Sequence, residues 1–330
     1  MPKEAVFVVP LDFSPDTEAT VSAAFALAQQ CGTQVHLLEV APNRGPSRLD
    51  AGGNQRKTTR LSPNQDWSRL EESIQAAQRR RIRVRAIAYR GDATKIIASY
   101  VQLTNARLLI LGQHYGTPRW RRSTRIVSSV SRSAPVPVLV LPPQPKRSKH
   151  QLPLFRHVVS AVDPTVASAV ALRTVFDLTR RTGARLTLVH ALKNAPSHMV
   201  FSGGEAGKAT RDLREEAARV AARLRRKIPA DVHIRVDARV ATGAPDRVIL
   251  AVASEVDADL VVMGVPLRTR LDEVLFGSTL QRVLRRTKIP LLILPVLAGA
   301  NQWLQEADGV ELPLIATTPE RGKRLPARRR

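Results

Sequence analysis

Cysteine is almost missing from this 330-residue chain, and Cys31 is its one cysteine. An intrachain disulfide and a cysteine-based zinc cluster are therefore excluded. No apolar run approaches the roughly 20 residues that a membrane-spanning helix needs. Residues 1–10 already have the apolar pattern of a strand and lack the layout of a signal peptide. These absences predict a protein of the reducing cytoplasm with no membrane span.

Acidic residues are also scarce. The chain has 28 Asp and Glu against 52 Lys and Arg, a formal net charge of +24. Such an excess favours contact with polyanions: nucleic acid, acidic proteins, acidic membrane surfaces or phosphorylated ligands. An arginine-rich solvated surface explains the same excess, and no groove-reading motif accompanies it. A nucleic-acid or acidic-protein partner therefore stays a hypothesis.

The sequence has many short apolar runs that alternate with helical patterns. Runs without polar alternation are typical of parallel strands buried on both faces. Expected strands of the first half are 6–11, 35–40, 82–88, 108–111 and 136–141, with a loop at 41–60. Expected strands of the second half are 158–162, 186–190, 232–240, 260–263 and 291–294. Each half thus predicts a doubly wound α/β domain.

The second half repeats the first. Landmarks of one residue type recur in one order, at spacings of 151, 151, 152 and 153 residues: Asp12 and Asp163, Gly32 and Gly183, Gly112 and Gly264, Pro142 and Pro295. We expect two domains, 1–143 and 153–298, joined by a basic linker at 144–152. The tail at 299–330 is basic and expected to be disordered.

Several segments resemble the universal stress protein family. They are VVPLDFSP with Asp12, SAVDPT with Asp163, the pair LLILG and LVVMG, and the closing SAPVPVLVLP and TKIPLLILP. The resemblance covers residues 3–142 and 155–296. It implies, for each half, a five-stranded parallel sheet of order 3-2-1-4-5 (adenine nucleotide alpha hydrolase-like). It also implies pairing of the two closing strands into an internal pseudo-dimer, and a further homodimer stays open.

ATP-binding members of that family carry Gly-x2-Gly-x9-Gly-Ser/Thr after the fourth strand. The second half has Gly264 and then Gly277-Ser278 at the matching spacing, but Leu267 replaces the second glycine. Leu267, which follows a proline, hinders close approach of backbone N–H groups to a phosphate. Arg268, together with Arg270, can compensate as a phosphate ligand.

The first half departs further from the motif. It keeps Gly112, but Tyr115 stands for the second glycine, and Thr124-Arg125 aligns with the Gly-Ser pair. We expect this half to be degenerate for ATP.

The resemblance also implies a role for each candidate residue. Asp163, and in the first half Asp12, would contact the adenine end of the nucleotide. Gly264 would admit the backbone, and Gly277, Ser278 and Thr279 would hold phosphates at a helix N-terminus, where N–H groups and the dipole attract anions. The plainer alternative is that the aspartates form turns and that Ser278 is only an N-cap.

Other motifs are weak. The segment at 202–210, SGGEAGKAT, lacks the first glycine and the Ser/Thr of a P-loop. The seven histidines have no metal-ligand spacing. Without an acid, base or nucleophile arrangement we predict no enzyme, and a weak ATPase activity stays open.

Two hypotheses remain. The first is a stress protein that binds ATP, or a related nucleotide, as a regulatory ligand in its second half. The second is a stress-linked interaction protein without nucleotide, whose basic surface and tail contact nucleic acid or acidic partners.

Overall fold

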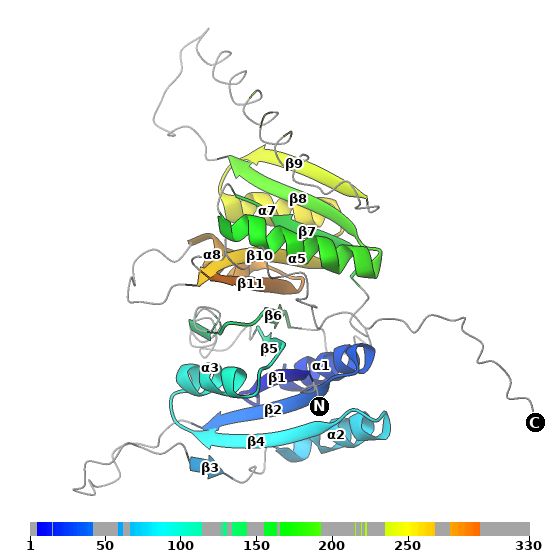
Figure 1. The fold of residues 1–330 in the computed structure, drawn as a ribbon, viewed down its shortest axis with the longest axis vertical. Helices are drawn as coiled ribbons and strands as arrows, with labels where there is room; N and C mark the ends of the chain where they lie inside the picture. Colours follow the sequence, from blue (N-terminus) through cyan, green and yellow to red (C-terminus); the bar gives the residue numbers. More distant parts are fainter. Residues whose placement is uncertain are drawn as a thin grey trace, which may run out of the picture.

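The computed structural model describes residues 5–14, 16–41, 59–61, 67–113, 127, 129–130, 134–143, 155–163, 166–192, 215, 219, 222, 235–267 and 278–297. In these residues helices cover one sheet of 11 strands (Figure 1). The expected linker at 144–152, the segment at 202–210 and the tail at 299–330 lie outside them.

The first half contributes six strands and three described helices. Their bounds are β1 Val6–Leu11, α1 Thr17–Cys31, β2 Gln34–Ala41, β3 Thr59–Leu61, α2 Ser68–Arg79, β4 Val84–Arg90, α3 Ala93–Leu103, β5 Leu108–Gly112 and β6 Val138–Leu141.

The second half contributes five strands and three described helices. Their bounds are β7 His157–Ala161, α5 Val166–Thr182, β8 Arg185–Leu192, β9 Val236–Thr242, α7 Pro245–Glu255, β10 Leu260–Leu267, α8 Ser278–Arg286 and β11 Leu291–Leu297.

The sheet confirms the predicted fold. Its strand order is β3-β4-β2-β1-β5-β6-β11-β10-β7-β8-β9. With β3 set aside, each half has the order 3-2-1-4-5. The closing strands β6 and β11 pair antiparallel, with Leu139 opposite Leu292. This junction forms the expected internal pseudo-dimer and turns two parallel sheets into one.

Some strand bounds differ from the expected ones. Residues 41–60 were expected to form a loop, but Ala41 ends β2, and Thr59 begins β3 by pairing antiparallel with Arg90 of β4. The strand expected at 82–88 begins at Val84.

Gly264 was expected to end its strand, which is wrong. It lies within β10, because the neighbouring β11 continues to offer backbone partners: Gly264 pairs with Leu294, and Leu267 pairs with Leu297. A glycine ends a strand only where such partners stop.

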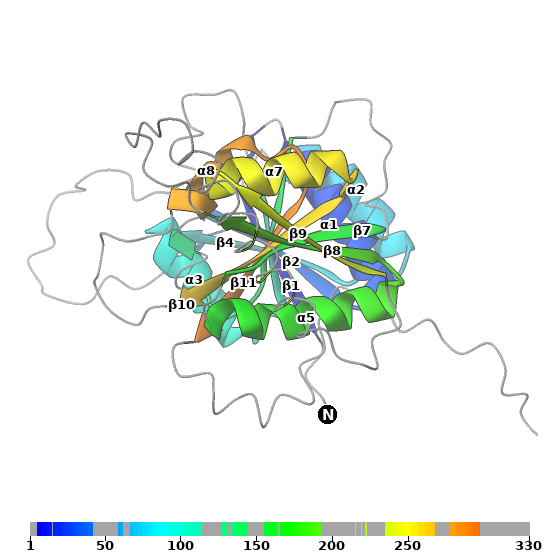
Figure 2. The ribbon, with the colours of Figure 1, turned by 90° about the horizontal axis from the view of Figure 1, so that it is seen from above.

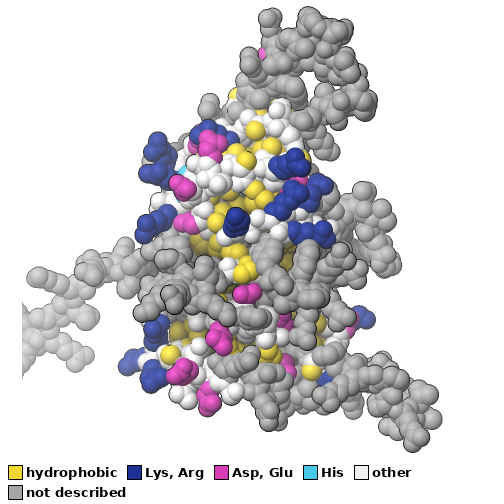
Figure 3. Space-filling view, turned by 180° about the vertical axis from the view of Figure 1, so that it is seen from behind, with side chains coloured by type: hydrophobic (Ala, Val, Ile, Leu, Met, Phe, Trp, Pro, Cys, Tyr) yellow, Lys and Arg dark blue, Asp and Glu magenta, His cyan; other side chains and the backbone are white. Residues whose placement is uncertain are grey.

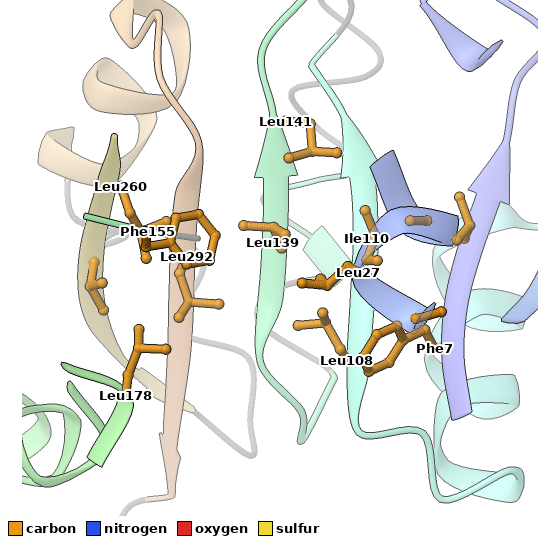
Figure 4. Close-up of a cluster of buried hydrophobic side chains, with 14 of the residues drawn as sticks. Phe7, Leu27, Leu108, Ile110, Leu139, Leu141, Phe155, Leu178, Leu260 and Leu292 are labelled. Carbon is orange, nitrogen blue, oxygen red and sulfur yellow. The ribbon is translucent and has the colours of Figure 1, made fainter. Parts of the chain in front are cut away.

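Helices cover both faces of the sheet. Figure 2 shows α7 and α8 on one face and α5 on the other. Each face has a buried apolar cluster, and each cluster extends from one half into the other. Leu139 and Leu292 carry one of them across the junction (Figure 4). Burying such a side chain contributes about 1.5–3 kcal/mol, so each half stabilises the closing strand of the other.

The helix ends follow from the sequence. Gly32 and Gly183 end α1 and α5 with left-handed φ angles of 61° and 68°, which glycine adopts at little cost. Cys31, the last residue of α1, packs against the core, and burial raises the pKa of its thiol to about 12. No helix in the described ranges is long and apolar enough to span a bilayer.

Candidate functional site

The second half brings two predicted site residues to one edge of the sheet. Strands β7 and β10 are parallel neighbours, with Ala161 opposite Met263. Asp163 and Gly264 follow these two residues, so both lie toward the carboxyl ends of adjacent strands. The helices α5 and α8, which follow these strands, pack on opposite faces (Figure 2). This is a topological switch point, where ligands of open α/β sheets bind.

Helix α8 begins at Ser278, the residue at which the motif predicts a helix start. Ser278 and Thr279 therefore occupy its first turn, whose N–H groups have no partner within the helix and whose dipole favours an anion. Of the other predicted phosphate contacts, Gly277 and Arg268 lie outside the described residues.

His190 also lies at this edge of the sheet, and the sequence analysis did not predict it as a site residue. It lies in β8, next to β7, and its Nδ1 lies 2.7 Å from the carbonyl oxygen of Val162, to which it donates a hydrogen bond. In the neutral ring that bond leaves Nε2 as an acceptor. His190 stands 151 residues after Glu39, so the repeat itself could have pointed to it.

The carboxylate of Asp12 is engaged by its own turn in the first half. Its Oδ1 accepts hydrogen bonds from the Ser14 backbone N–H at 3.1 Å and from the Thr17 hydroxyl at 3.2 Å. This favours the turn interpretation for Asp12. Gly112 ends β5 as expected, opposite Leu141.

An aromatic contact covers the strand ends of the first half. Trp67, at the start of α2, donates from Nε1 to Oε2 of Glu39 at 2.8 Å, and both side chains are buried. The ring of Phe13 meets the Trp67 ring edge-on, with centroids 5.7 Å apart. Glu39 lies near the end of β2 and Phe13 follows β1, so these three side chains pack together near the carboxyl ends of those strands.

An ion-pair group supports α8 in the second half. Asp246, at the start of α7, is only 1% exposed. Arg286 Nη1 donates to its Oδ2 at 2.6 Å, and Arg282 Nε lies 2.9 Å from its Oδ1. The group fixes α8 against α7 and so holds the helix whose first turn faces the candidate site. Its counterparts in the first-half sequence include Thr94 and Ser129, which are uncharged.

Gln113 connects the halves. Directly after β5, its backbone N–H donates to the Leu141 carbonyl at 2.7 Å. Its side-chain Nε2 donates to the carbonyl of Leu284 in the last turn of α8. A first-half residue thereby caps the helix that the second-half site uses. In the part of the chain that the structure describes, no group of three or more His, Cys, Asp and Glu is arranged to hold a metal ion.

Fold and topology together define a class: a tandem doubly wound α/β protein whose two halves share one sheet. The universal stress protein family matches residues 6–142 and 154–295, and the chain belongs to this family.

Solved structures show the same fold over nearly the whole chain. A universal stress protein from Archaeoglobus fulgidus has a TM-score of 0.57 at 19% identity, covering 88% of this chain and 98% of that one. A putative universal stress protein from Pseudomonas aeruginosa has a TM-score of 0.53 at 17% identity, covering 89% and 94%. A universal stress protein of Methanocaldococcus jannaschii is 22% identical over 140 residues, 42% of this chain and 82% of its own.

Proposed function

We propose that this protein is a cytoplasmic stress-response factor that binds one adenine nucleotide, ATP or a close relative, in its second half. The observation that carries the proposal is the switch point between β7 and β10: Asp163 follows β7, Gly264 lies in β10, and α8, the next helix, begins at Ser278. The spacing of the sequence motif and the geometry of the sheet point to the same place, although the residues involved come from different parts of the chain.

Each residue has a distinct role in this proposal. Asp163 orients the adenine end, and Gly264 lets the backbone approach the ligand because it has no Cβ. The first-turn N–H groups of α8, at Ser278 and Thr279, hold phosphates, with Arg268 adding charge. We assign no catalytic residue, so the nucleotide acts as a regulatory state and not as a rapidly turned-over substrate.

The first half has a supporting role in this proposal. Glu39, Trp67 and Phe13 already pack against one another near the carboxyl ends of its strands. Its contribution is mechanical: the shared sheet and the Gln113 cap hold α8. One nucleotide per chain follows from this asymmetry.

The direct test is the nucleotide content of freshly purified protein, freed of nucleic acid, denatured and analysed by mass spectrometry. Titration with added ATP, and with cAMP because another universal stress protein has been crystallised in complex with cAMP, completes it. Gly277→Asp puts a carboxylate beside the phosphates. Thr124→Asp is the matched change in the first half.

We expect about one adenine nucleotide per chain, lost in Gly277→Asp and kept in Thr124→Asp. Absence of bound nucleotide, together with no binding of ATP or cAMP at millimolar concentration, would overturn the proposal.

A further inference from the structure

The amino edge of the first half carries a run of arginines, far along the strands from its carboxyl edge. Arg79 ends α2, and Arg80 and Arg81 follow it. Arg83 directly precedes β4, and Arg85 is its second residue; all five arginines are exposed. Successive residues of a strand alternate between its faces, so Arg83 and Arg85 lie on one face. We call these five residues the arginine edge.

A groove runs along this edge. Its volume is about 580 Å³, and Arg81, Arg83 and Arg85 line it together with Gln34 and Gln78. Figure 3 shows that Lys and Arg side chains gather toward the rims of both halves on one face of the molecule. The groove thus offers several guanidinium groups to one elongated ligand.

The second half supplies an internal comparison. Val35 N–H donates to the carbonyl of Arg83 at 2.8 Å, and Leu186 N–H donates to that of Arg235 at 3.0 Å. The two bonds are equivalent, so Arg83 corresponds to Arg235, and Arg85, two residues on, corresponds to Asp237.

The charges at these equivalent positions differ. Asp237 accepts from Arg239 Nε at 2.8 Å, and Arg239 Nη1 lies 3.6 Å from Glu255. The second-half edge is therefore partly neutralised. Among the residues that the structure describes, no carboxylate forms an ion pair with Arg81 or Arg85. Arg81 and Arg85 therefore keep their positive charge available to a ligand.

The chemistry of the groove favours a phosphate backbone over a protein. Protein interfaces depend on apolar or aromatic anchors at their centre, and the groove has no aromatic lining residue, while its isoleucine, Ile82, is 5% exposed. Binding to nucleic acid without sequence preference needs only cations that neutralise phosphates. Guanidinium groups also match phosphate oxygens in a bidentate geometry.

We propose that the arginine edge binds nucleic acid through its phosphate backbone, without regard to sequence. This surface is separate from the nucleotide site, belongs to the other half and does not depend on the proposed function. The protein would then combine a nucleotide-binding half with a half that contacts a polyanion.

The test measures the fluorescence anisotropy of a short labelled single-stranded RNA with the full chain at several salt concentrations. The edge variant combines Arg81→Gln, Arg83→Gln and Arg85→Gln. The control combines Arg156→Gln, Arg185→Gln and Arg235→Gln, which removes the same charge from exposed positions at the amino edge of the second half. A second variant, Arg79→Gln with Arg80→Gln, leaves the strand untouched.

We expect the edge variant to bind at least about tenfold more weakly and to reduce the slope of log affinity against log salt by about 2, since each lost phosphate contact on a single strand contributes about 0.7. The Arg79/Arg80 variant should weaken binding in the same direction, and the control should change it by less than about threefold.

Equal losses in the edge variant and the control would overturn the proposal, because net charge alone would then explain binding. Wild-type affinity in both the edge variant and the Arg79/Arg80 variant would overturn the proposal too. Equally tight binding of polyglutamate, lost in the same variants, would overturn the assignment to nucleic acid.

Discussion

The two halves have the same strand order and pair through one sheet, yet the surfaces at their strand ends differ. Above the carboxyl ends, the first half places Glu39, Trp67 and Phe13. At the corresponding edge, the second half has Asp163 and His190. At the amino ends the contrast reverses, with Arg81, Arg83 and Arg85 lining a groove in the first half and Asp237 paired with Arg239 in the second. The pairing of buried strands imposes the same constraint on the sequence of both halves, whereas side chains at the strand ends were free to diverge.

The largest expected effect comes from breaking the ion-pair group of Asp246, Arg282 and Arg286 in the second half. Asp246→Asn leaves Arg282 and Arg286 without their carboxylate and should lower the free energy of unfolding by about 2–4 kcal/mol. Thr94→Val, at the matching first-half position, should cost less than about 1 kcal/mol. Urea unfolding measures both, and hydrogen exchange should show faster opening of α8 in the first variant. Equal losses of unfolding free energy in the two variants would show that this difference between the halves does not contribute to stability.

The aromatic cover of the first half gives the next effect. Trp67→Phe removes the indole donor from the buried Glu39 carboxylate and should cost about 1.5–3 kcal/mol, the range for hydrogen bonds to charged groups. Thermal unfolding measures the loss. Nucleotide stoichiometry should stay at one per chain, since the second half provides the site. A second bound nucleotide in this variant would mean that Trp67 masks a working site.

A pH effect is expected from His36 in the first half. Burial, and secondly Arg85, lower the pKa of His36 to about 4, and its Nδ1 lies 2.8 Å from the Tyr100 hydroxyl. Because the folded-state pKa lies below the ordinary 6.5, the unfolded chain binds more protons between these values. Stability should therefore fall by about 1–3 kcal/mol as pH decreases from 6.5 to 4.

His36→Gln isolates this contribution, and the second half has the non-titrating Thr187 at the equivalent position. Unfolding free energies of wild type and variant, measured from pH 7 to pH 4.5, should converge toward low pH. Parallel pH profiles would contradict the assignment to His36.

The parallel core was predictable because its strands are apolar on both faces and its landmarks recur at constant spacing. The ends of the strands were not predictable. β3 has no apolar pattern and exists because β4 offers an open edge, and β10 continues past Gly264 because β11 runs beside it. Such limits depend on neighbours that a local pattern does not contain.

The site divides in the same way. Asp163, Gly264 and Ser278 were predicted through the family resemblance; Asp163 follows β7 and Ser278 begins α8, whereas Gly264 lies within β10 and not at its end. Asp246 was not, because its partners come 36 and 40 residues later and only tertiary packing joins them. The Glu39–Trp67 bond likewise spans 28 residues.

Photo-crosslinking with an azido derivative of ATP, followed by peptide mapping, tests the division between the halves most directly. The account predicts one adduct per chain, confined to peptides from residues 153–298 and competed by unlabelled ATP. Adducts of equal yield in residues 1–143, or adducts that ATP does not compete, would contradict it.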